Sequence, residues 1–392
     1  MTVTRTRAMG SSAIVFALSL AVPSAAAAAA TAHPAPLSPQ EIHWRGRPTA
    51  VGALAAELGQ PNANAVAGSL DRYDEWVEAN DYHVALSEDG RVVLITKSKK
   101  ASKRRMKLVE EALDAFDALL APPDRSASEE SFVVAEWGVG DHVPDAEPVV
   151  LIEVEGADRY RSLLTGIGAE RPQLEGWARS QFSQPGFAEE RVSTAAWQAA
   201  PDGFEVGDVW RSENELVNRL ARLLVHRSFG PQPTWLRIGC AWRVEMAVQG
   251  SIYCFPYRQE FVGVGEHGGW EADLKRAFKK RKKRPLEVDE FASWRRNRWS
   301  DEHAQLAWGF VEYLARHEPT ALPEVAEAFR ERYKAGFRTT HDDGTWSTDP
   351  TFQVPMDAQL EVLRSSAGED VMERATAFFR AGKRYRPRKR RG

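Results

Sequence analysis

The stretch that most constrains the fold is an amphipathic segment over residues 212–227. Its apolar residues recur at intervals of three and four, at Leu216, Leu220, Leu223 and Leu224. This spacing predicts a helix with one buried face. Asn214 and Asn218 are four residues apart and therefore share a helix face, with Glu215 next to the first of them. We expect a packed helix that presents two amides and a carboxylate near its N-terminal end.

The segment Asn214-Glu215-Leu216-Val217-Asn218 has the spacing of the zinc motif H-E-x-x-H, with asparagine in place of both histidines. In that motif the two imidazoles converge on one zinc ion, and the glutamate activates a bound water. Asparagine amides are neutral, weakly donating oxygen ligands and do not replace an imidazole pair for zinc. The pattern predicts that the helix is retained and the metal chemistry is lost.

The residues around this helix resemble the gluzincin metallopeptidases, in particular the secreted, peptidase-MA-like group. Pro233 to Ala241 (PTWLRIGCA) is similar to the family segment P-x-W-L-x-E-G-x-A, and Ala304 to Leu314 (AQLAWGFVEYL) is similar to a later helix. Upstream, Val149 to Val154 followed by Asp158 to Leu164 resembles the strand and helix that precede the active-site helix. The resemblance covers about 148 to 316, and more loosely 80 to 335.

The resemblance implies zinc-ligand positions at Asn214, Asn218 and Ile238, and a general-base position at Glu215. Only Glu215 matches the family. We therefore predict a degenerate member that holds no metal, uses no cofactor and has no catalytic residue in place. Glu245, two turns after Ile238, has no partners that the sequence identifies.

Two other interpretations concern the same helix. Ser212-x-x-Glu215 matches a capping box, in which Ser212 caps the helix and Glu215 bonds back to its amide. Asn218 is expected to hydrogen-bond a neighbouring strand in place of a ligand. His226 is eleven residues after Glu215, roughly 16 Å along the axis, and is too far away to share an ion with it.

The N-terminus has the pattern of a secretory signal. Arg5 and Arg7 precede an apolar stretch at 13–22, and small residues follow it up to Ala30. No later segment has 18 uninterrupted apolar residues, so we expect an exported chain, periplasmic or extracellular, with no membrane span after cleavage. Export would permit a disulfide between Cys240 and Cys254, and two buried thiols are the alternative.

The order of patterns predicts an α+β fold, in which a small mixed sheet packs on a helical, gluzincin-like subdomain with extra C-terminal helices. Expected elements are a hairpin at 82–96, a central strand at 149–154, an edge strand at 188–197 and helices at 103–120, 212–227, 235–246, 300–316, 323–334 and 357–380, the last interrupted near Gly368. The predicted divisions are a signal peptide (1–31), a linker with short helices (32–80), the peptidase-fold domain (81–335), a C-terminal helical extension (336–382) and a basic tail (383–392).

Three functions are consistent with these features. The first is an exported, inactive pseudo-metallopeptidase that binds a peptide or an envelope component, with tryptophans such as Trp235, Trp242 and Trp308 in its groove or, more in keeping with their type, in its core. The second is an active hydrolase with a non-standard site. The third is an envelope-binding module that uses basic clusters at 97–107, 275–284 and 383–391. In an exported protein such clusters suit anionic envelope polymers or lipid headgroups better than nucleic acid.

A further motif, Gly263-Val264-Gly265-Glu266-His267-Gly268, matches G-x-G-x-x-G. A dinucleotide site requires this motif within a βαβ unit, and a basic segment rather than a strand follows it here. We therefore expect a loop rather than a nucleotide site.

Overall fold

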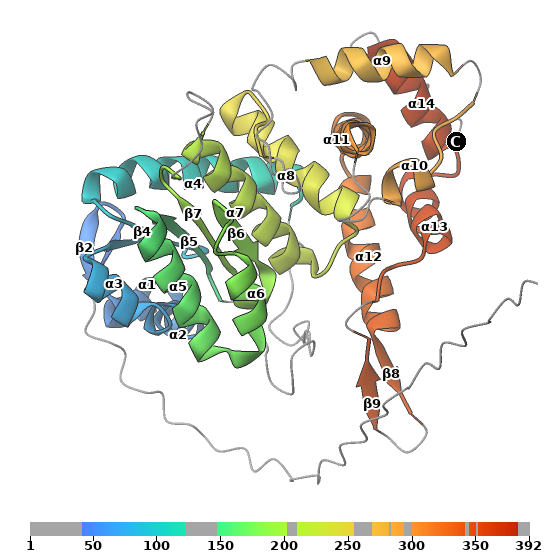
Figure 1. The fold of residues 1–392 in the computed structure, drawn as a ribbon. Coiled ribbons are helices and arrows are strands. Elements are labelled where there is room, and N and C mark those ends of the chain that lie inside the picture. Colours follow the sequence, from blue (N-terminus) through green and yellow to red (C-terminus); the bar gives the residue numbers. More distant parts are fainter. Residues whose placement is uncertain are drawn as a thin grey trace, which may run out of the picture. The chain divides into compact units, whose positions relative to one another are not determined.

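The computed structural model describes residues 41–121, 147–201, 210–254, 269–281, 284–293, 300–341, 345–349 and 352–382. Over these residues the chain has the predicted α+β fold, with a seven-stranded mixed sheet and helices on both of its faces (Figure 1). The signal-like N-terminus, the G-x-G-x-x-G motif and the basic tail lie outside the described residues. No described helix is both long and apolar enough to cross a membrane.

The sheet has the strand order β2-β1-β3-β4-β5-β7-β6. Its pairs β1–β3, β4–β5 and β5–β7 are parallel, whereas β1–β2, β3–β4 and β6–β7 are antiparallel. The strands are β1 (Glu41–Trp44), β2 (Arg47–Ala50), β3 (His83–Leu86), β4 (Val92–Thr96), β5 (Val149–Val154), β6 (Gly186–Glu189) and β7 (Thr194–Gln198).

The central strand β5 is buried along its whole length because both faces of the sheet are covered. Val149 and Leu151 belong to the core on one face, and Val150 and Ile152 belong to the core on the other. This alternation follows the two-residue period of a strand. A strand that is apolar on both faces, apart from Glu153, therefore lies inside the sheet, as the sequence predicted.

One face of the sheet is covered by α2, α3, α5 and α6, and the other by α4, α7 and α8, to which the C-terminal helices are added. The helices before α7 are α1 (Ala55–Leu58), α2 (Gln60–Asp71), α3 (Asp74–Asn80), α4 (Lys99–Leu119), α5 (Ala157–Glu170) and α6 (Glu175–Ser180). Those that follow are α7 (Ser212–Phe229), α8 (Thr234–Gln249), α9 (Trp270–Lys280), α10 (Asp289–Ala292), α11 (Asp301–His317), α12 (Ala321–Phe337), α13 (Met356–Ala367) and α14 (Val371–Ala381). A short ribbon, β8 (Arg338–Thr340) with β9 (Trp346–Thr348), follows α12.

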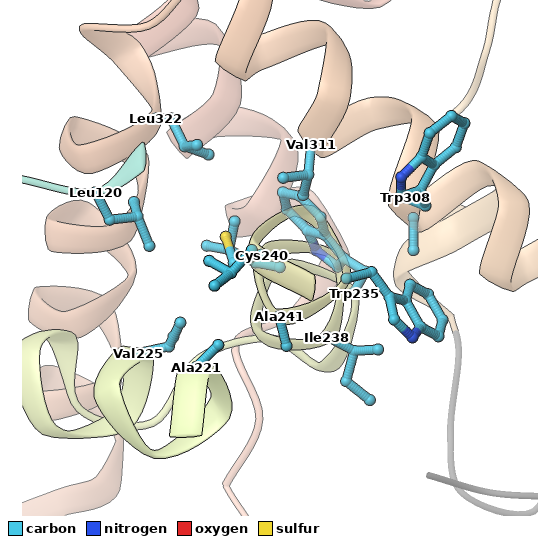
Figure 2. Close-up of a cluster of buried hydrophobic side chains, with 14 of the residues drawn as sticks. Leu120, Ala221, Val225, Trp235, Ile238, Cys240, Ala241, Trp308, Val311 and Leu322 are labelled. Carbon is cyan, nitrogen blue, oxygen red and sulfur yellow. The ribbon is translucent and has the colours of Figure 1, made fainter. Parts of the chain in front are cut away.

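Helix α8 is enclosed by the larger of the two cores. Trp235 packs edge-on against Phe291, Phe310 and Phe329, and its ring nitrogen donates to Gln359 Oε1 at 3.0 Å. Figure 2 shows Cys240 of α8 between α7 and Val311 of α11. Trp235, Trp242 and Trp308 are all buried, so packing is their role, as the sequence favoured.

Two features of the sheet differ from the prediction. The segment expected as one edge strand over 188–197 forms two strands, because the chain turns at Ser193, whose φ is 48°. Of these, β6 is at the edge and β7 is internal. In addition, residues 41–50, expected as linker, form β1 and β2 and extend the sheet beside β3.

Candidate functional site

Helix α7 follows β7 in the chain. Its first turns carry four buried polar residues: Ser212, Asn214, Glu215 and Asn218. The predicted capping box is wrong. The residue that caps α7 is Arg211, with no side-chain cap hydrogen bond. The Ser212 hydroxyl instead donates to the buried Glu153 of β5 and accepts from Trp197 Nε1 at 2.7 Å. Ser212 therefore anchors the start of α7 to the sheet.

The two asparagines of α7 converge on one carboxylate of α8. Asn214 Nδ2 donates to Glu245 Oε1 at 2.7 Å, and Asn218 Nδ2 donates to Glu245 Oε2 at 2.9 Å. All three side chains are buried, and Glu245 has no exposed surface. The four-residue spacing puts the two amides on one face of α7, so that each reaches one oxygen of the same carboxylate.

Two backbone groups complete the surroundings of Glu245. The N–H groups of Tyr253 and Cys254 donate to its Oε1 at 2.6 and 3.2 Å. Burial raises the pKa of Glu245 to about 8, although the four N–H donors act in the opposite direction. The cluster joins α7, α8 and the segment after α8 through one side chain.

Ile238 is not part of this cluster. It lies seven residues before Glu245, about 10 Å earlier along α8, and is fully buried in the hydrophobic core. The carboxylate that meets the asparagine pair therefore comes from Glu245, and not from the position that the family resemblance implied. The predicted bond of Asn218 to a strand is also wrong, since its partner belongs to a helix.

Glu215, which the family resemblance would make the general base, is engaged by a cation of its own helix. Arg219 lies 2.6 Å from its carboxylate, and both side chains are nearly buried. Burial, together with the nearby Glu215 and Glu245, raises the pKa of the Cys254 thiol. Burial raises the pKa of the Tyr160 phenol of α5, an effect that the charge of Arg219 opposes and that of Glu215 adds to. Glu215 thus lies among charged and polar groups in the protein interior.

The two cysteines are free and buried, which corresponds to the thiol alternative rather than the disulfide. Cys240 packs in the apolar core, where burial raises its pKa. Cys254 lies beside the Glu245 cluster. Each thiol thus contacts different surroundings.

The residues that could hold a cation at this site are two amides and one carboxylate. Within the described ranges, no group of three or more His, Cys, Asp or Glu side chains has a metal-binding arrangement. His226 lies beside Glu190 and Arg237, and burial lowers its pKa, an effect that Arg237 adds to and Glu190 opposes. The donor set at the asparagine pair lacks the imidazole or thiolate groups that zinc prefers.

A buried ion pair next to the site was not predicted. Arg105 of α4 donates to both carboxylate oxygens of Glu153, at 2.6 to 3.1 Å, and both residues are almost completely buried. The sequence offered two signals for this pair. One was the single glutamate within the apolar run 149–154, and the other was an arginine on the buried side of the predicted helix 103–120. Glu245 gave a similar signal, as the one acidic residue of the predicted helix 235–246.

A scan against models of known protein families found no match for this chain, and a search of curated proteins found no significantly similar one.

Proposed function

We propose that this protein is an exported, peptidase-like protein without peptidase activity, which binds a peptide at the sheet edge beside α7. The observation that carries the proposal is the direction of the two asparagine amides. Both Asn214 and Asn218 donate an N–H to Glu245, so the positions that resemble zinc ligands serve a hydrogen bond between two helices.

The chemistry of the cluster opposes a catalytic metal. Zinc requires ligands that offer it a lone pair, and catalytic sites keep one coordination position open for water. Here four N–H donors already occupy the two oxygens of Glu245. Glu215 is paired with Arg219, so its carboxylate is not placed over a metal-bound water. These contacts support a cluster that neither binds a catalytic metal nor activates water.

The peptide ligand is proposed from the position of β6. Among the described strands β6 pairs only with β7, and it contacts α7. An edge strand offers main-chain N–H and C=O groups to which an extended peptide can add as a further strand. The edge strand β6 and the helix α7, which carries Asn214 and Asn218, are thus neighbours.

Metal analysis and a peptidase assay on the purified protein test whether it lacks zinc and peptidase activity. We expect no stoichiometric zinc after dialysis and no cleavage of peptide substrates. Zinc that survives dialysis, together with cleavage that is lost in Glu215→Gln, would reject the proposal and favour an active hydrolase with a non-standard site.

A further inference from the structure

A cleft of about 730 Å³ opens where the parallel strands β5 and β7 end. Val154, the last residue of β5, is paired with Gln198, the last residue of β7. The turn into α5 forms one wall of the cleft, and the segment just before β6 forms the other. Figure 1 shows α5 and β6 at this part of the sheet. Ligands of α/β proteins commonly bind outside the carboxyl ends of parallel strands.

The N-terminus of α5 faces this cleft. Gly156 precedes the helix with φ 85°, a conformation that favours glycine, and offers no side chain to cap the first-turn N–H groups. These groups carry the positive end of the helix dipole. Arg159 lines the cleft, and its Nη1 donates to Glu155 O at 3.2 Å, which keeps the guanidinium next to the turn. Helix N–H groups and a guanidinium together suit a carboxylate.

Gln198 supplies an independent sign of a ligand. It lines the cleft, yet only 6% of its surface is exposed. Its Nε2 lies 3.5 Å from Gln184 O, whereas its Oε1 has no hydrogen-bond partner among the described residues. A buried acceptor without a donor is costly, and an N–H group of a ligand would satisfy it.

The other charged residues of the lining are Glu155, Asp158 and Arg161, of which Asp158 and Arg161 pair with each other at 3.5 Å. Apolar residues of the lining would receive an amino-acid side chain. Phe182 and Pro185 provide apolar surface on the wall opposite the α5 turn. Gly186, the first residue of β6, directly follows Pro185, so the cleft adjoins the start of the edge strand. A chain end bound in the cleft would therefore lie next to the edge to which an extended peptide can add.

We infer that this cleft binds the C-terminal end of a peptide. The terminal carboxylate lies at the N-terminus of α5 beside Arg159, a peptide N–H donates to Gln198 Oε1, and the last side chain packs on Phe182 and Pro185. This inference rests on the proposed peptide-binding function and specifies its ligand.

Calorimetric titration of the full chain with acetyl-Ala-Ala-Leu and with its C-terminal amide tests the inference. The two probes differ only in the terminal group, which is a carboxylate in one and a neutral amide in the other. We expect the acid to bind at least about tenfold more tightly than the amide, with a preference that weakens as salt rises. Arg159→Gln should reduce the preference for the acid, because only the N-terminus of α5 and Arg161 then remain to favour the charge. Gln198→Met should weaken both probes because it removes the acceptor that they share.

Arg179→Gln is the matched control, since Arg179 is an exposed arginine of α6 that pairs with Glu175 and does not line the cleft. Thermal unfolding of each variant separates loss of binding from loss of fold. Equal affinity for acid and amide, or no binding of either probe at millimolar concentration by the folded protein, would overturn the inference. Zinc content and peptide cleavage are measured separately. A protein that binds the acid and also cleaves peptides would refute the proposed lack of peptidase activity and leave the peptide-binding cleft supported.

Discussion

At Glu245, a carboxyl group with no exposed surface accepts hydrogen bonds from four N–H donors. Its burial favours the protonated form, and the donors favour the ionised form. Burial has the larger effect, because the pKa rises to about 8 from an ordinary value of 4.5. This one side chain therefore gives the stability of the protein a dependence on pH.

The first prediction concerns that dependence. A carboxyl group whose pKa is higher in the folded protein stabilises it fully below about pH 4.5, and this stabilisation is lost as the pH rises through about 8. We expect the free energy of unfolding to fall, on the order of 4 kcal/mol between about pH 5 and pH 9 for this group. Urea unfolding at several pH values measures it. Glu245→Gln, which cannot titrate, should flatten the profile, and an unchanged slope in that variant would contradict the assignment.

The second prediction concerns zinc. With Asn214→His and Asn218→His, two imidazoles would face Glu245, a His₂Glu set that zinc accepts. We expect the double variant to retain about one zinc per chain through dialysis. Adding Glu245→Gln should abolish retention, and equal retention without the carboxylate would show that Glu245 is not a ligand. Adding Ile238→Glu instead should mainly destabilise the protein, because it places a carboxylate in the apolar core.

Among the elements, the contact of α7 with the sheet edge depends on a glycine of β6. A Cβ at Gly186 would lie 2.7 Å from Ala196 O and 2.8 Å from both Trp197 Cβ and Arg219 Nη2. Two of these atoms belong to β7, and the third belongs to the arginine that pairs with Glu215. The absence of a side chain thus allows β6, β7 and α7 to approach closely.

The third prediction is a pair of glycine substitutions with opposite signs. Gly186→Ala should destabilise the protein by about 1 to 3 kcal/mol, because backbone must shift to admit the methyl group. Gly166→Ala, in the exposed face of α5 where a Cβ would meet nothing within 4 Å, should stabilise it by about 0.5 to 1 kcal/mol. Chemical denaturation measures both. A neutral Gly186→Ala would show that the edge adjusts without cost.

Across the described residues as a whole, the apolar core on the α7 side continues from the sheet into the C-terminal helices. It includes Leu151 of β5, Trp235 of α8 and Phe379 of α14. Hydrogen bonds cross the same boundary, from Trp235 to Gln359 and from the Leu286 N–H to Thr376. The described part of residues 336–382, predicted as an extension, thus shares a core with residues 81–335.

The fourth prediction compares two truncations. A chain that ends at residue 355 lacks α13 and α14 and leaves Trp235 without its acceptor, so we expect loss of a single cooperative thermal transition and binding of a dye for exposed apolar surface. A chain that ends at Gly382 keeps all of the described core and should melt within a few degrees of the full chain. A cooperative, unchanged transition in the shorter chain would show that the C-terminal helices fold separately.

The sequence by itself determined the elements whose apolar pattern is long or continuous, among them α7, α11 and β5. It also determined the break between α13 and α14, where Gly368 has φ 98°. These follow from local physics, since periodicity and backbone freedom act within a few residues.

The tertiary structure decided which groups meet. Asn218 and Glu245 are 27 residues apart, and their contact depends on the rotation of two helices about their axes. Contacts between distant segments also decide that β1 pairs with β3, that β7 lies inside the sheet and that the two thiols remain apart. The four-residue spacing puts Asn214 and Asn218 on one face of α7. The packing of α8 against that face decides that they contact the carboxylate of Glu245 rather than the side chain of Ile238.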